Sequence, residues 1–224
     1  MSKQHDVAFL VDVDNTLLDN DAIISDIMQF LDAVVGHEGQ RVYWKIFDEL
    51  RAELGYADYL GALQRYRMAQ PRGVHLLQLS SFLVNYPFAT RLFPGALEAI
   101  QHLGRWGPVV ILSDGDVVFQ PLKVERSGLA AAVDGRVLIY IHKERMLDDV
   151  ELRYPARHYV MIDDKLRILA AMRDSWGSRL TTVFPRQGHY AHDSKLLAKY
   201  PAADVSVDTI SDLLALPLAA FVPD

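Results

Sequence analysis

Two aspartates separated by one residue, Asp12 and Asp14, are the side chains whose type and spacing best suit chemistry. They follow the apolar run Val7–Val11, which is typical of a buried parallel strand. Side chains on a strand alternate between its faces, so both carboxylates are expected to point the same way. Side by side at the end of a buried strand, they repel each other unless a cation neutralises them. This pattern predicts a magnesium-assisted reaction in which one carboxylate attacks and its neighbour transfers protons.

Two alternatives compete with this interpretation. A calcium loop of the D-x-D-x-D-G type is disfavoured, because Leu17 stands where that loop needs glycine and Ile23 where it needs its last carboxylate. The aspartates could also simply end a strand and begin a turn, as aspartate often does. Polar residues at the ends of other predicted strands decide between these interpretations.

A second polar cluster, formed by Ser113, Asp114 and Gly115, follows the apolar run Pro108–Leu112. A serine hydroxyl and backbone N–H groups eased by glycine, at a turn from strand to helix, suit the binding of a phosphate group. The alternative is a helix cap, for which serine and aspartate are also favoured.

A second pair of aspartates, Asp163 and Asp164, follows the apolar run Tyr159–Ile162 and again calls for a cation. Either residue could instead cap the helix that comes next. Between the two clusters, Lys143 could reach the carboxylates and balance their charge, although a single lysine is usually solvated. Lys123, on the helix predicted after Ser113, is the rival for that place.

Composition narrows the class of protein. The chain has 224 residues, of which half are hydrophobic and 23% are charged, as expected for a globular protein of one large domain or one domain with an insertion. Its net charge of -6 predicts neither a nucleic-acid nor a membrane partner. The lack of cysteine excludes disulfides, thiolate metal sites and cysteine nucleophiles. With no apolar signal core and no run of membrane-spanning length, a cytoplasmic protein is expected.

Apolar residues spaced by three and four predict a run of helices after Thr16, each ended by glycine or proline. These helices run from about Ile24 to Gly36 and over Tyr43–Leu54, Tyr59–Met68 and Leu76–Val84. Such stripes predict a small helical bundle. From Phe93 onward strand and helix patterns alternate, with strands at about residues 109–112, 136–141, 159–162, 180–184 and 204–207. The helices predicted between and after them include Val117–Ser127 and a last helix that follows residue 207.

This alternation predicts an α/β fold with a doubly wound parallel sheet, Rossmann-like and covered by helices on both faces, to which the first strand also belongs. The expected core comprises residues 1–17 and 93–224, and residues 18–92 form an all-helical insertion after the first strand. Active sites of such sheets lie at the carboxyl ends of the strands, where the polar clusters are predicted.

The order D-x-D-x-T, then a serine that ends a strand, then lysine, then two aspartates that end a strand, resembles the haloacid dehalogenase superfamily of phosphatases. The motif residues are Asp12, Asp14 and Thr16, then Ser113, Lys143, Asp163 and Asp164. The resemblance covers the whole chain. The helical insertion after the first motif is similar to the C1-type cap of this superfamily. It implies that Asp12 is a nucleophile that forms an aspartyl-phosphate. Asp14 would protonate the leaving group and then activate water.

The resemblance also implies supporting roles. Ser113, with Asp114 and Gly115 beside it, would bind the phosphoryl group. Thr16 would help to hold the loop and the substrate, and Lys143 would neutralise Asp12 and the phosphate. The implied cofactor is Mg²⁺, held by Asp12, by the backbone carbonyl of Asp14 and by Asp164. Asp163 stands where the family has glycine, so the division of the metal between Asp163 and Asp164 stays open.

Asp14 also bears on the class of reaction, because dehalogenating members of the superfamily lack this second aspartate. The expected function is therefore a magnesium-dependent phosphohydrolase that acts on a small phosphorylated metabolite. Two alternatives stay open: a phosphomutase of the same superfamily, and a non-catalytic module that binds or regulates. The sequence leaves the oligomeric state open.

The helical insertion is expected to set substrate specificity by covering the strand ends. Asn20 and Asp21 lie at its hinge. Its candidate contacts are basic and aromatic residues, which on helices more often serve packing or solvation. These candidates are Tyr43, Trp44, Lys45, Arg51, Arg65, Tyr66, Arg67, Arg72 and His75.

Overall fold

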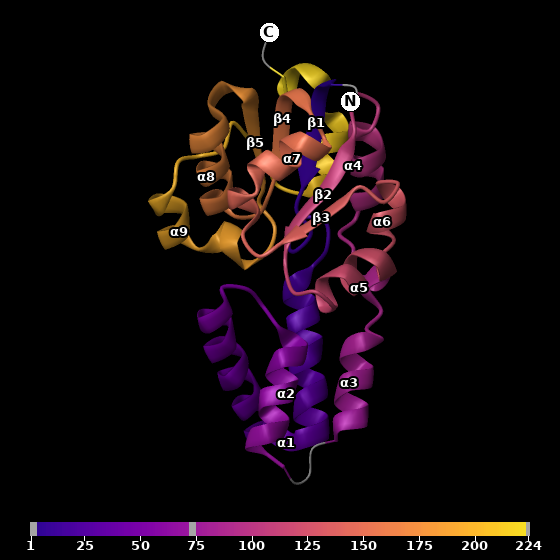
Figure 1. The fold of residues 1–224 in the computed structure, drawn as a ribbon, viewed down its shortest axis with the longest axis vertical. Coiled ribbons are helices and arrows are strands. Elements are labelled where there is room, and N and C mark those ends of the chain that lie inside the picture. Colours follow the sequence, from indigo (N-terminus) through magenta and orange to yellow (C-terminus); the bar gives the residue numbers. More distant parts are fainter. Residues whose placement is uncertain (1–3, 72–74, 223–224) are drawn as a thin grey trace.

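The computed structural model describes residues 4–71 and 75–222, and its centre is a parallel sheet of six strands in the order β3-β2-β1-β4-β5-β6 (Figure 1). The strands are β1 (His5–Val11), β2 (Val109–Asp114), β3 (Val137–Tyr140), β4 (Ala156–Ile162), β5 (Leu180–Pro185) and β6 (Val205–Val207). From β1, the chain adds β2 and β3 on one side of the sheet and then β4, β5 and β6 on the other side. The predicted α/β fold with a parallel sheet is confirmed.

Helices cover both faces of the sheet because the strands are apolar on both sides. On one face, Phe9 and Ile111 pack with α4 (Ala96–Leu103), α5 (Phe119–Arg126) and α6 (Leu129–Ala132). On the other face, Leu10 and Met161 pack with α7 (Leu147–Arg153) and α8 (Leu166–Trp176). The short helix α9 (Ser194–Lys199) lies beside α8 in Figure 1.

Three helices extend from the edge of the sheet at which β1 ends: α1 (Asn20–Leu54), α2 (Tyr59–Ala69) and α3 (Leu76–Val84) (Figure 1). We refer to α1–α3 as the helical cap. Gly36 interrupts α1 with φ 74° and ψ 168°, a conformation that only glycine adopts readily. The predicted helix end at Gly36 therefore corresponds to a kink that joins two helices.

The chain enters and leaves the helical cap at the same place. Leu18 pairs with Leu92 in an antiparallel bridge. The N–H of Asp19 donates to the carbonyl of Arg91 at 2.7 Å, and the N–H of Phe93 donates to the carbonyl of Leu17 at 2.9 Å. These contacts support the predicted boundaries of the insertion at residues 18 and 92, which stay a prediction together with its assignment to the C1 type.

Some predicted elements differ from the observed ones. The helix predicted from Val117 begins at Phe119, because the Asp116 carboxylate accepts hydrogen bonds from the N–H groups of Val118 and Phe119 at 2.8 and 2.6 Å. The predicted last helix consists of two 3₁₀ segments, Ile210–Ala215 and Leu218–Ala220. Across residues 4–71 and 75–222, no helix combines the length and apolar character needed to cross a membrane.

Candidate active site

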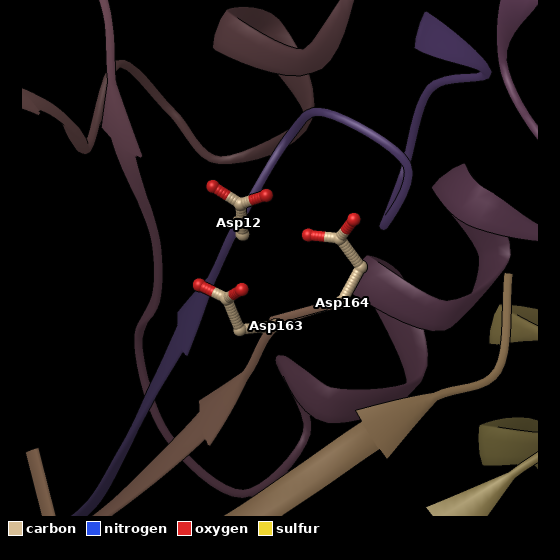
Figure 2. Close-up of side chains that lie close together, drawn as sticks. All are labelled: Asp12, Asp163 and Asp164. Carbon is tan, nitrogen blue, oxygen red and sulfur yellow. The ribbon is translucent and has the colours of Figure 1, made fainter. Parts of the chain in front are cut away.

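Three buried carboxylates meet where β1 and β4 end. Val11 pairs with Ile162 in the sheet, so the residues that follow, Asp12 and Asp163, lie side by side. Asp164 comes next on the β4 side, and ligand atoms of the three aspartates all lie within 4.8 Å of one another. Figure 2 shows the three side chains around one common space. Since Asp12 is 2% exposed and both others 0%, water cannot screen their repulsion.

Lys143 supplies the positive charge inside this cluster. Its ammonium group contacts Asp12 Oδ1 directly, lies 2.7 Å from Asp163 Oδ2 and donates to the carbonyl of Leu112 at 3.1 Å. The side chain is 1% exposed, although a single lysine is usually solvated. Lys143, and not its rival Lys123, therefore occupies the position that the sequence predicts for a charge-balancing lysine.

The three carboxyl groups differ in pKa because burial and the nearby charges act on each of them to a different extent. Burial opposes ionisation of Asp12, but Lys143 and, at longer range, Lys165 outweigh it and lower the pKa of Asp12 below its usual value. Burial raises the pKa of Asp163 and raises that of Asp164 well above the usual range. Asp12 is thus the carboxylate most readily ionised, as a nucleophile requires.

The donor set of this cluster fits a magnesium ion. Neither oxygen of the Asp164 carboxylate accepts a hydrogen bond from the residues that the structure describes, and Lys165 Nζ lies 3.9 Å from Oδ1. Two buried oxygens without a hydrogen-bond donor are costly unless a cation binds them. Asp12 faces the same space, and Mg²⁺ prefers carboxylate ligands together with water. Asp12 and Asp164 would bind the ion, whereas Asp163 forms an ion pair with Lys143.

Ser113 and Thr16 both contact the Asp12 carboxylate. The Ser113 hydroxyl donates to Oδ1 at 3.4 Å, and the Thr16 hydroxyl donates to Oδ2 at 3.5 Å. Thr16 also accepts a hydrogen bond from the N–H of Asp164 at 3.1 Å, which ties the loop after β1 to the loop after β4. Thr16 is fully buried and does not line the cavity described below, so its observed contacts are with protein groups.

The sequence predicts that backbone N–H groups at Ser113–Gly115 bind a phosphate group, but the N–H of Gly115 is not available for this. Its N–H donates to the carbonyl of Tyr140 at 2.9 Å, so the sheet already uses this donor. A Cβ atom on Gly115 would lie 2.4 Å from the Cβ of Gln120, and Gln120 Nε2 donates to the Ser113 hydroxyl at 2.9 Å. Gly115 therefore provides space for Gln120, a residue that the sequence does not single out.

Asp114 is the last residue of β2, and its side chain binds protein. It accepts the N–H of Lys143 at 2.7 Å and so fixes the turn that carries this lysine. Burial raises the pKa of Asp114 to about 6, despite the nearby Lys143. The carboxyl group also lines the cavity, which leaves it within reach of a bound molecule.

Asp14 does not lie beside Asp12 as strand alternation predicts, because β1 ends at Val11 and the chain then turns. The Asp14 carboxylate accepts a hydrogen bond from Lys123 Nζ at 2.6 Å, and the same ammonium group donates to Asn20 Oδ1 at 3.0 Å. The Asp14 carboxylate lies outside the cluster of three aspartates, whereas the ligand atom predicted for Asp14 is its backbone carbonyl. Lys123 is therefore a second buried lysine, which holds the second aspartate.

A cavity of about 300 Å³ lies between the helical cap and the strand ends. It is lined on the core side by Asp14, Asp114 and Asp164 and on the cap side by residues of α1, including Asn20 and Arg51. Among the described candidate contacts of the cap, Arg51 alone lines this cavity, while Tyr43 and Tyr66 pack inside the cap. Arg72 lies outside the described residues.

The family model of haloacid dehalogenase-like hydrolases matches residues 7–175, which is more than half of the chain. The chain belongs to this family. A crystal structure from Burkholderia xenovorans LB400, described as a haloacid dehalogenase-like hydrolase, has 63% sequence identity and a TM-score of 0.91, with 95% of this chain and 99% of that chain covered.

More distant members share the fold. The HAD-hydrolase YfnB from Bacillus subtilis, bound to magnesium, has 17% identity and a TM-score of 0.65, with 95% of this chain and 100% of that chain covered. The L-2-haloacid dehalogenase from Xanthobacter autotrophicus has 17% identity and a TM-score of 0.60, with 93% and 97% covered. Comparison with curated proteins finds no match.

The position of Lys143 in this HAD-like hydrolase generates a stability prediction. We expect Lys143→Met to lower the free energy of unfolding by about 3–5 kcal/mol at neutral pH, because two buried carboxylates lose their common cation. Lys143 lowers the pKa of Asp12 in the folded state, so this stabilisation is present above the unfolded pKa and is lost as the pH falls. Urea denaturation at neutral and acidic pH measures the difference.

The matched control is Lys45→Met, since the Lys45 side chain in the cap is 77% exposed. It should change the free energy of unfolding by less than about 0.5 kcal/mol. Equal losses for the two variants would contradict the charge-balancing role of Lys143.

The raised pKa of Asp164 generates a prediction of the opposite sign. A carboxyl group whose folded pKa exceeds its unfolded pKa destabilises the fold when both states are ionised, and acidification relieves this cost. Asp164→Asn should therefore raise the melting temperature of the magnesium-free protein at neutral pH. It should also abolish the rise that Mg²⁺ causes in the wild type. Thermal unfolding in chelator and in Mg²⁺ measures both effects, and an unchanged response to Mg²⁺ would remove Asp164 from the ligand set.

Proposed function

We propose that this HAD-like hydrolase is a magnesium-dependent phosphohydrolase that cleaves a small phosphate monoester through an aspartyl-phosphate on Asp12. The observation that carries this proposal is the second aspartate. Asp14 lines the cavity two residues after the buried Asp12 and is held there by Lys123 at 2.6 Å. Hydrolysis of a phosphate ester needs a group that gives a proton to the leaving oxygen and takes one from water, and Asp14, which lines the cavity, is the candidate for that group.

The reaction has two steps. In the first, an oxygen of the Asp12 carboxylate attacks phosphorus, the bond from phosphorus to the ester oxygen breaks, and Asp14 gives the departing oxygen a proton. In the second, Asp14 takes a proton from water, the water oxygen attacks phosphorus, and the bond to Asp12 breaks to release inorganic phosphate. Ser113 and Lys143 are near enough to Asp12 to bind phosphoryl oxygens in both steps.

Magnesium, held by Asp12 and Asp164, would neutralise negative charge on the phosphoryl oxygens. The acidic protein needs this help, because three buried carboxylates repel a phosphate dianion and Lys143 alone does not balance them. Magnesium is bound in the YfnB structure, which is evidence about that protein only. For this chain, the proposed magnesium site is supported by the two Asp164 oxygens, which accept no hydrogen bond from the described residues.

The helical cap bears on access and substrate size. Asp12 is 2% exposed and does not line the cavity, so a substrate reaches it only after the cap or the loops move. Contacts that hold the cap against the core include Arg51 with the Tyr190 hydroxyl at 3.2 Å and Asp21 with His189 Nδ1 at 2.7 Å. A cavity of about 300 Å³ suits a small metabolite better than a protein segment.

Phosphate release tests this function directly. A panel of phosphorylated metabolites and a panel of 2-haloacids are incubated with the protein, with and without Mg²⁺, and free phosphate and free halide are measured. We expect phosphate release that depends on Mg²⁺ and falls at least about a thousandfold in Asp12→Asn, which lacks the attacking oxygen. Halide release without phosphate release would replace the proposal by dehalogenation. A stable phosphoenzyme with little free phosphate would favour a phosphomutase, and no reaction would favour a binding module.

Asp14→Asn tests the proton-transfer role separately. The amide cannot donate or accept the proton, so we expect steady-state turnover to fall about 10²–10⁴-fold. Asp12 can still attack substrates with good leaving groups, so the variant should accumulate the aspartyl-phosphate. Rapid quenching with an activated aryl phosphate detects this species. Turnover equal to that of the wild type would contradict the role of Asp14.

A further inference from the structure

The residue after Asp163 and Asp164 is a lysine whose side chain lines the cavity. Lys165 lines the cavity, and its side chain is 28% exposed. Its own N–H donates to Asp163 Oδ1 at 2.8 Å, which fixes its backbone at the end of β4. The ammonium group lies 3.9 Å from Asp164 Oδ1 and 5.5 Å from the centre of the Tyr190 ring. A positive charge is therefore held at the cavity wall next to the catalytic cluster.

A second cation reaches the same place from the helical cap. Arg51 lies in the last turn of α1 and lines the cavity, and its guanidinium group donates to the Tyr190 hydroxyl at 3.2 Å. Tyr190 thus contacts Arg51 through its hydroxyl and Lys165 through its ring. The two cations come from opposite sides of the cavity and share one aromatic partner.

Two other charged side chains that line the cavity already have ion-pair partners. Arg167 pairs with Glu144 at 2.9 Å, and Asp14 pairs with Lys123 at 2.6 Å. Within residues 4–71 and 75–222, neither Arg51 nor Lys165 donates a side-chain hydrogen bond to a carboxylate. Two cations without such a partner, in a partly enclosed cavity, form a site that favours an anion.

This anion differs from the phosphoryl group that reacts. The reacting group belongs beside Asp12, where Lys143 and Ser113 contact the nucleophile. Arg51 belongs to the cap, on the opposite side of the cavity from the strand ends. An anion between Arg51 and Lys165 therefore belongs to the leaving group. Apolar side chains from both sides, Phe47 and Leu197, line the same cavity and suit a short carbon chain between the two charges.

We propose that Lys165 and Arg51, bridged by Tyr190, bind a second anionic group of the substrate, so that the preferred substrates are phosphate monoesters whose alcohol carries a carboxylate or a second phosphate. This inference rests on the proposed function. The preference for such substrates would then depend on Lys165, which follows Asp164, and on Arg51 of the cap.

Three esters of equal chain length test the preference: the phosphate of 3-hydroxypropionate, propane-1,3-diol bisphosphate and propyl phosphate. We expect kcat/KM for at least one doubly anionic ester to exceed that for propyl phosphate by more than tenfold. In Lys165→Met and in Arg51→Gln this advantage should fall at least tenfold, mainly through KM. For propyl phosphate, the change in kcat/KM caused by Arg51→Gln should stay below about threefold, whereas Lys165→Met also removes a charge that acts on Asp12 and Asp164. Comparison of the first two esters identifies the anion as carboxylate or phosphate.

The matched control is Lys45→Met, which removes an exposed cationic side chain of the cap outside the cavity lining. It should leave all three kcat/KM values within twofold of the wild type. Equal kcat/KM for the three esters in the wild type would overturn the proposal, and so would equal losses for all three esters in Arg51→Gln.

A binding measurement separates this proposal from the proposed reaction. In Asp12→Asn, calorimetry with the same esters measures affinity without turnover. Tighter binding of a doubly anionic ester, lost when Lys165→Met or Arg51→Gln is added, supports the anion site even if the wild type releases no phosphate. Equal affinities for the three esters would overturn the site while leaving the hydrolase activity intact.

Discussion

Charge balance among buried carboxylates is the constraint on which the rest of this structure depends. The pairing of Val11 with Ile162 forces Asp12 and Asp163 together at the ends of β1 and β4, with Asp164 next to them. One buried lysine cannot neutralise three such groups. The result is one carboxylate whose pKa is lowered, two whose pKa is raised, and a set of oxygen donors that suits Mg²⁺.

The helical cap and the core contribute different residues to the candidate site. Strand ends of the core carry the three buried aspartates. The cap is joined to the core by two chain segments that pair at Leu18 and Leu92. Arg51 from the cap and Lys165 from the core both contact Tyr190, so the proposed recognition of the leaving group would depend on the position of the cap.

Much of the fold and part of the site can be predicted from the sequence, because apolar runs reveal parallel strands and polar residues end them. Asp12 and Asp163 follow from that rule, whereas the choice of Lys143 over Lys123 does not. The direction of Asp14 does not, because it depends on where β1 stops and on Lys123, 109 residues away. The use of the Gly115 N–H by Tyr140, and the meeting of Lys165 with Arg51, likewise depend on contacts between distant segments.

The most direct test of the central claim is a crystal structure of the wild-type protein with Mg²⁺ and beryllium fluoride, which mimics a phosphoryl group on a carboxylate. The account predicts beryllium bonded to an oxygen of Asp12, Lys143 against the fluorides, and the metal between Asp12 and Asp164. A fluoride complex on another carboxylate, or a metal bound away from Asp164, would contradict it.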